Sequence, residues 1–151
     1  MKILVVSDSH GRDQHLYSAI YHHKDLDILI HLGDGEHDLK IAKNELIGKK
    51  IIQVQGNCDY FSQLPVTLIE NIKNHKFLIT HGAAQRVKSN LSKLIVEAKK
   101  YNCHFALFGH THIPYYEQQS GIHLFNPGSI AKGQYGVITI TDTITFEHFE
   151  M

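Results

Sequence analysis

Five apolar runs of this chain each end in a short cluster that contains Asp, Asn or His next to glycine or another polar residue. The clusters are Asp8-Ser9-His10, Gly33-Asp34, Gly56-Asn57-Cys58-Asp59, Thr80-His81-Gly82 and Gly109-His110-Thr111-His112. They follow one another at intervals of roughly two dozen residues, and a parallel crossover connection needs about a dozen or more. Each cluster can therefore return to the same edge of a sheet, where open α/β folds bind their ligands.

The apolar runs themselves predict β-strands, because they are short and rich in β-branched residues. The predicted strands cover residues 3–6, 28–32, 50–54, 77–80, 105–108, 123–125, 136–141 and 143–149. The first five are continuously apolar, as expected for strands that are covered on both faces. The last two lie close together and alternate, which predicts a hairpin that turns at Thr141-Asp142.

Helical patterns separate the early strands. Asp13 is a candidate cap for a first helix, residues 37–46 repeat at helical spacing, and Ser89 is a candidate cap for a third helix. The apolar stripes are Leu16, Ala19 and Ile20 in the first, Leu39, Ala42 and Leu46 in the second, and Leu91, Leu94, Ile95 and Ala98 in the third. This order of elements predicts an α/β domain of two packed sheets with outer helices.

Composition narrows the class of protein further. The length of 151 residues fits one domain over residues 1–151. The 15 basic and 15 acidic residues balance, so no bulk charge attracts nucleic acid or an anionic membrane. Two cysteines make no disulfide framework, and the apolar run near Met1 is too short for a signal segment or a spanning helix. We therefore expect a cytoplasmic protein without a membrane or nucleic-acid partner.

Taken together, the strand-end clusters offer two carboxylates, one carboxamide and four imidazoles, which is enough to hold two divalent metal ions. Each cluster alone has a plainer reading, as a turn, a cap or a pair of surface histidines. The candidate ligands are Asp8, His10, Asp34, Asn57, His81, His110 and His112. His31, inside an apolar run, is expected to lie in the core or behind the ligands.

Spacing within two clusters suggests how the side chains could converge. Asp8 and His10 stand at i and i+2, as do His110 and His112, so each pair shares one side of the chain if the backbone stays extended. Asp34 is the natural bridge, because its two carboxylate oxygens can serve two ions. The sequence alone thus predicts a metal centre at the ends of the strands.

The motifs D-x-H, G-D, G-N, H-G and G-H-x-H, in this order, closely resemble the calcineurin-like metallophosphoesterase superfamily. The Gly-Asn-Cys-Asp variant and the segment at 126–129 resemble its small YfcE-type phosphodiesterases. The resemblance implies a four-layer α-β-β-α sandwich with two packed mixed sheets and outer helices. It also implies one metal held by Asp8, His10, Asp34 and His112, and a second held by Asp34, Asn57, His81 and His110.

The implied reaction is hydrolysis of a small phosphodiester by a metal-bridging hydroxide, with Mn²⁺ as the expected metal and Zn²⁺, Fe²⁺ or Ni²⁺ as alternatives. Asp34 and Asn57 would act through the metals, and Cys58 and Asp59 are further catalytic candidates. Cys58 stands where many superfamily members carry His. Arg12 and Arg86 follow two of the clusters and are candidate substrate contacts, although solvated loop arginines would look the same.

Two other functions remain open at this stage. One is a phosphomonoesterase that acts on a small phosphorylated metabolite. The other is a non-catalytic scaffold of the same fold, like a eukaryotic retromer subunit that resembles this family. A structural zinc site is disfavoured, because such sites are mostly rich in cysteine. The sequence is also compatible with a homo-oligomer.

Overall fold

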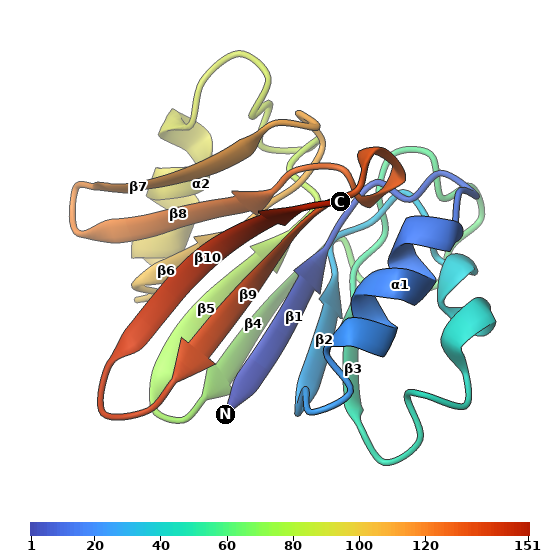
Figure 1. Cartoon of the computed structure of the whole chain (residues 1–151). Coiled ribbons are helices and arrows are strands. Elements are labelled where there is room, and N and C mark those ends of the chain that lie inside the picture. Colours follow the sequence, from blue (N-terminus) through green and yellow to red (C-terminus); the bar gives the residue numbers. More distant parts are fainter.

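The computed structural model describes residues 1–151 and contains two five-stranded sheets, two α-helices and two short 3₁₀ helices (Figure 1). The first sheet has the order β10 (Ile144–Glu150), β9 (Gln134–Ile140), β1 (Lys2–Val6), β2 (Ile28–His31) and β3 (Lys50–Gln53). Strands β1, β2 and β3 are parallel, whereas β9 and β10 form an antiparallel hairpin against β1. The hairpin predicted around residues 141–142 is confirmed.

The second sheet has the order β4 (Thr67–Ile72), β5 (His75–Thr80), β6 (Phe105–Leu107), β8 (Ile122–Pro127) and β7 (Pro114–Gln119). Its three central strands are parallel, and each edge strand pairs antiparallel with its neighbour. Both sheets are therefore mixed. The predicted α/β fold with two packed mixed sheets is confirmed.

Three apolar clusters divide the molecule into layers. The largest lies between the sheets and includes Ile3 and Val5 from β1 and Phe77 and Ile79 from β5. Alternate residues of β1, β2, β5 and β6 face outward and are also buried, as predicted for these apolar runs. The run at 50–54 differs, because β3 is a sheet edge and Ile51 is 43% exposed. The helices α1 (Gln14–His22) and α2 (Ser92–Lys100) cover opposite outer faces and complete the other two clusters (Figure 1).

The helix predictions need three corrections. Asp13 stands at the N-cap of α1, but its side chain makes no capping hydrogen bond. Residues 37–46 do not form an α-helix: only a 3₁₀ turn, η1 (Asp38–Ala42), is present, and the Asp38 carboxylate at its start accepts hydrogen bonds from the loop after β1. Ser89 does not cap α2. The Asn90 side chain accepts the backbone N–H of Ser92 instead, so the helix begins later. A second 3₁₀ turn, η2 (Ile130–Lys132), precedes β9.

Strands β4 and β7 were not predicted from the apolar pattern. Both are sheet edges in which polar residues interrupt the apolar ones, and β7 begins with Pro114, a residue that edge strands tolerate. The residues of their hairpin turns, Lys73-Asn74 and Ser120-Gly121, could have revealed these strands. Both residues of each pair have positive φ, as a type I′ hairpin turn requires, and Asn and Gly are common there.

The parallel strands of each sheet point their carboxyl ends to one edge of the molecule, where the five polar clusters begin. Neither helix has the length and apolar character that crossing a membrane requires. The fold therefore places all seven candidate ligands on loops at strand ends.

Candidate metal centre

The two sheets contribute different parts of the site. The first sheet supplies Asp8 and His10 after β1, Asp34 after β2 and Asn57 after β3. The second sheet supplies His81 directly after β5, and His110 and His112 after β6. The distances given below show that all seven side chains meet between the sheets.

The backbone reaches this arrangement through left-handed conformations, not through extended ones. The φ angles are +57° at Asp8, +47° at His10, +59° at Asp34, +69° at His110 and +60° at His112. The expectation that each i, i+2 pair shares one side of an extended segment is therefore wrong. A non-glycine residue held in this region costs about 1–3 kcal/mol, and such strain gathers at functional sites.

Glycine is required where the loops approach one another. Gly33 has a φ of +101°, and a Cβ there would lie 2.6 Å from the backbone nitrogen of Gly56. A Cβ on Gly56 would collide with the carboxylate of Asp34. The two Gly positions of the G-D and G-N motifs thus let neighbouring loops close around Asp34.

The Asp8 carboxylate is buried, and its two oxygens have different partners. Its Oδ2 accepts the Ser7 hydroxyl at 2.6 Å and the backbone N–H of His110 at 3.0 Å. Its Oδ1 instead faces the imidazoles of His112, at 3.1 Å from Nε2, and His10, at 3.5 Å from Nε2. One oxygen therefore fixes the side chain, and the other is free to bind a cation.

The two carboxylate oxygens of Asp34 also have different partners. Its Oδ1 accepts the backbone N–H of Cys58 at 2.7 Å. Its Oδ2 lies 3.2 Å from Nε2 of His81 and 3.6 Å from Nε2 of His10. This single oxygen faces imidazoles from both sides of the site, which is the arrangement that a bridging carboxylate needs.

The donor atoms form two compact groups. In the first group, Asp8 Oδ1 joins the Nε2 atoms of His10 and His112, which lie 3.4 Å apart. In the second, Nε2 of His81 lies 3.2 Å from Nδ1 of His110 and 3.0 Å from Oδ1 of Asn57. His110 and His112 therefore serve different groups although they stand two residues apart.

These separations fit metal coordination. Two ligand atoms that each lie about 2.0–2.1 Å from one ion at a tetrahedral angle are about 3.3–3.4 Å apart. The separations of 3.0–3.6 Å cited above bracket that value. Mixed carboxylate, imidazole and amide donors suit Mn, Fe, Ni or Zn ions better than Ca or a soft Cu(I) ion.

His81 is the most constrained imidazole. It is buried, and its Nδ1 donates to the carbonyl oxygen of Leu32 at 2.7 Å, so Nε2 is directed at Asp34. Burial alone would lower the pKa of His81, but the Asp34 and Asp8 carboxylates and the Leu32 carbonyl together outweigh it and raise that pKa. Burial would likewise raise the pKa of Asp34, and His81 holds it well below its usual range.

The carboxylate of Asp59, a catalytic candidate from the sequence, bonds the backbone of two loops, and its catalytic role stays a prediction. Its Oδ1 accepts the backbone N–H groups of Gly35 and Glu36, and its Oδ2 accepts those of Asp34 and Gly56. Burial raises its pKa less than these four bonds lower it, so the pKa lies below its usual range. With both oxygens occupied, Asp59 holds the Asp34 loop against the Asn57 loop as a positioning residue.

A network of buried polar side chains supports the loops of the site. Ser9 donates to Asp38 at 2.5 Å and lies 3.0 Å from Nε2 of His31, whose Nδ1 accepts the N–H of Gly33. His31 is fully buried, as expected, and lies behind the Asp34 loop. A polar residue inside an apolar run was the available signal for this network.

The segment at 126–129 braces the G-H-x-H loop. Asn126 donates to the carbonyl of Gly109 and to the hydroxyl of Thr111, each at 3.0 Å. Ser129 donates to the backbone carbonyl of Asp8 at 2.9 Å. This segment therefore links the loops from the two sheets.

The remaining candidates lie at the edge of the site. The Cys58 thiol comes within 4.8 Å of donor atoms of His10 and Asp34, and burial followed by the Asp34 charge raises its pKa. Arg12 and Arg86 are exposed, and neither guanidinium has a hydrogen bond or ion pair with another residue. Their role as substrate contacts stays a prediction.

Comparison with known proteins decides the family. Residues 1–143 match the model of the calcineurin-like phosphoesterase superfamily domain. The chain belongs to this superfamily. The resemblance carried by the five motifs is thus confirmed, and the chain is a metallophosphoesterase family member that is expected to act on phosphate esters.

Two relatives and one solved structure show what the chain is similar to. The chain is 33% identical to the probable metallophosphoesterase YsnB of Bacillus subtilis over 86% of this chain and 75% of that protein. It is 28% identical to the phosphodiesterase MJ0936 of Methanocaldococcus jannaschii, over 93% and 90%. Zinc-bound Vps29 of Entamoeba histolytica shares the fold, with a TM-score of 0.79 and 17% identity over 99% of both chains.

Proposed function

We propose that the protein, acting as one domain over residues 1–151, is a phosphodiesterase that uses two divalent metal ions. The observation that carries this proposal is the position of Asp34 Oδ2, which faces His81 at 3.2 Å and His10 at 3.6 Å and so joins two donor groups. The first group would be Asp8, His10, Asp34 and His112. The second would be Asp34, Asn57, His81 and His110.

When bound, two such ions neutralise the phosphate oxygens and provide hydroxide at neutral pH as the nucleophile. The residues of the chain set the charge of the centre. Two ions carry four positive charges, which the carboxylates of Asp8 and Asp34 and one hydroxide reduce to about +1. This remainder matches a singly charged phosphodiester better than a doubly charged monoester.

The chain itself orients the ligands before any substrate binds. Protein donors hold one oxygen of Asp8 and one of Asp34, so the other oxygen of each needs no rearrangement. The Leu32 carbonyl fixes the ring of His81. Such preorganisation around the reacting charge accounts for a large share of enzymatic rate enhancement.

The named phosphodiesterase among the relatives also supports diester hydrolysis. Mn²⁺ is the proposed metal, because hard oxygen donors from two carboxylates and an amide accompany the imidazoles. A cytoplasmic location and a homo-oligomeric state stay predictions from the sequence.

The test is hydrolysis of bis(p-nitrophenyl) phosphate by purified protein before and after chelation. Removing the metal should lower the rate by at least about 10³-fold, and added Mn²⁺ should restore it. Full activity in chelator would contradict the proposal. A higher kcat/KM on p-nitrophenyl phosphate would instead favour the phosphomonoesterase, and a metal-loaded protein inactive on both esters would favour the scaffold.

A further inference from the structure

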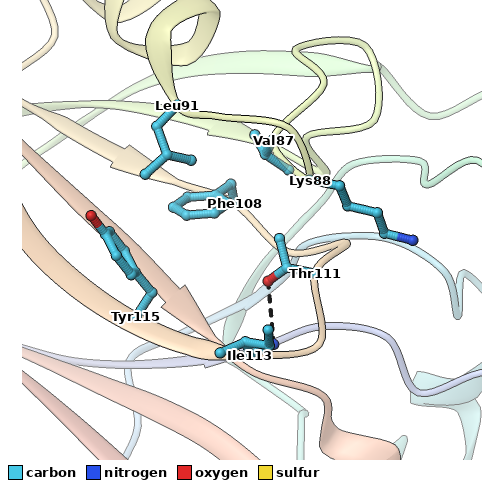
Figure 2. Close-up of a pocket in the computed structure, with 7 residues that line it drawn as sticks. All are labelled: Val87, Lys88, Leu91, Phe108, Thr111, Ile113 and Tyr115. Atoms are coloured by element: carbon cyan, nitrogen blue, oxygen red, sulfur yellow. Dashed lines mark hydrogen bonds between the residues drawn. The ribbon is translucent and has the colours of Figure 1, made fainter.

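An apolar cavity of about 330 Å³ opens beside the candidate metal centre, between the start of α2 and the chain that follows β6 (Figure 2). Five of its seven lining residues are hydrophobic. The hollow on the other side of the centre, next to Cys58, is lined almost entirely by polar residues. Holding metal ions therefore does not explain the apolar cavity.

The walls of the cavity are well supported. Phe108 is almost fully buried and forms the centre, with Leu91 and Val87 packed above it in the view of Figure 2. The ring of Tyr115 lies 6.2 Å from that of Phe108, at an interplanar angle of 61°. The Tyr115 hydroxyl donates to Glu117, which leaves the ring facing the cavity. An incoming group would meet mainly carbon atoms on the walls, while one side stays open to solvent.

The cavity and the metal centre share one segment of chain. Phe108, Thr111 and Ile113 line the cavity, whereas His110 and His112, interleaved with them, point to the two donor groups. Asn126 holds this segment through the Thr111 hydroxyl. Residues that line the cavity and candidate ligands therefore alternate along one short segment of chain.

The rim of the cavity carries a positive charge, which suits a ligand that is both apolar and anionic. Lys88 is the one charged residue that lines the cavity, and in Figure 2 its side chain extends away from Phe108 on the side of Thr111. Lys88 lines the same cavity as Thr111, the residue that separates His110 from His112 in the chain. The cavity thus combines apolar walls with one cation beside the segment that carries two candidate ligands.

The cavity offers few groups that could recognise a nucleobase. The Thr111 hydroxyl oxygen already accepts from Asn126 and from the backbone N–H of Ile113. The Tyr115 hydroxyl is engaged by Glu117 and Gln119. Selection inside the cavity would therefore depend on shape and apolar contact.

We propose that this cavity binds an apolar ester group, aromatic or branched aliphatic, of a phosphodiester whose phosphate binds at the metal centre, and that Lys88 pairs with that phosphate. The inference rests on the proposed function and names its substrate class. Burying such a group is worth about 10- to 100-fold in selectivity.

The kinetic test compares phenyl p-nitrophenyl phosphate with methyl p-nitrophenyl phosphate, which release the same leaving group. The wild type should prefer the phenyl ester in kcat/KM by about 10- to 100-fold. Ile113→Gln and Leu91→Gln, from two different elements, should each reduce this preference at least about threefold. Ile47→Gln is the matched control, because Ile47 is also a well-exposed isoleucine, 75% against 64%, and does not line the cavity.

The charge test replaces Lys88 by methionine. Lys88→Met should raise the KM of both esters by about tenfold and leave the preference for phenyl unchanged, because the ammonium contacts the phosphate they share. The control is Lys99→Met, which also removes one exposed lysine, on α2, that does not line the cavity. An unchanged KM in Lys88→Met would overturn this part of the proposal.

Binding of phenylphosphonate and methylphosphonate to metal-loaded protein separates the failure of this inference from that of the proposed function. Tighter binding of phenylphosphonate that is lost in Ile113→Gln supports the cavity even if no diester is hydrolysed. Hydrolysis of both diesters at equal efficiency, with equal affinity for both phosphonates, would overturn the inference and leave the phosphodiesterase standing.

Discussion

The half of the site that follows the first sheet differs from the half that follows the second. The first sheet brings Asp8 and Asp34, both buried, and each uses one oxygen to bond the protein while the other faces the site. The second sheet brings imidazoles. His81 is buried and fixed, but the side chain of His112 is 34% exposed.

This difference indicates a division of labour. Both carboxylates are rigidly held, and Asp34 faces both donor groups, so a change at Asp34 should disturb both. His110 and His112 each belong to one group, so a change there should disturb one. Substitutions in each half test whether one change disturbs both donor groups or only one.

The largest effect is expected for Asp34→Asn. It removes a negative charge from the oxygen that faces both groups, so metal content should fall well below two per chain and turnover by at least about 10³-fold. Metal analysis and diester hydrolysis measure both quantities. His31→Gln, in the buried network behind the same loop, should lower stability yet leave metal content nearly intact. Equal metal loss in both variants would show that Asp34 is no more a ligand than His31.

Removing one imidazole should have a smaller and more local effect. His112→Ala should empty the first group and His110→Ala the second, and each variant should keep close to one metal per chain. We expect activity to fall by about 10²-fold in each. If either variant loses both metals, the proposed independence of the second half is wrong.

Asp59→Asn tests the clamp between two loops of the first half. An amide cannot accept four N–H groups as a carboxylate does, so the free energy of unfolding should fall by about 2–3 kcal/mol. Thermal or urea unfolding measures it, with Asp142→Asn at the exposed hairpin turn as the control.

The pH dependence of this loss has a defined sign. The folded pKa of Asp59 is depressed, so its stabilisation is present above the unfolded value of about 3.9 and is lost as pH falls through the lower folded value. The difference between wild type and Asp59→Asn should therefore shrink on acidification. A difference that is constant down to pH 2 would contradict the clamp.

The smallest effect is expected for Cys58→Ala. The thiol lies at the edge of the first group and is not one of the proposed metal ligands. Aryl diester hydrolysis should therefore change by less than about threefold. Cys58→His should mainly help poor leaving groups, since a positioned general acid contributes about 10²–10⁴-fold. Loss of aryl diester hydrolysis at unchanged metal content in Cys58→Ala would assign the thiol a catalytic role.

The sequence was sufficient for the elements whose physics is local. Runs such as 3–6 and 77–80 are apolar on both faces and could only be central strands, and the clusters behind them could only meet at strand ends. The helices α1 and α2 followed from amphipathic spacing. The edge strands β4 and β7 escaped detection because polar residues interrupt the apolar pattern of each.

The chain by itself therefore determined which residues gather and which chemistry they offer. The tertiary structure alone decided how they are held: the left-handed backbone at Asp8 and His112, the oxygen of each carboxylate that stays free, and the clamp made by Asp59. The physical reason is distance along the chain. Asp8 bonds the backbone of His110 and Asp59 bonds that of Asp34, and no local pattern records contacts between residues so far apart.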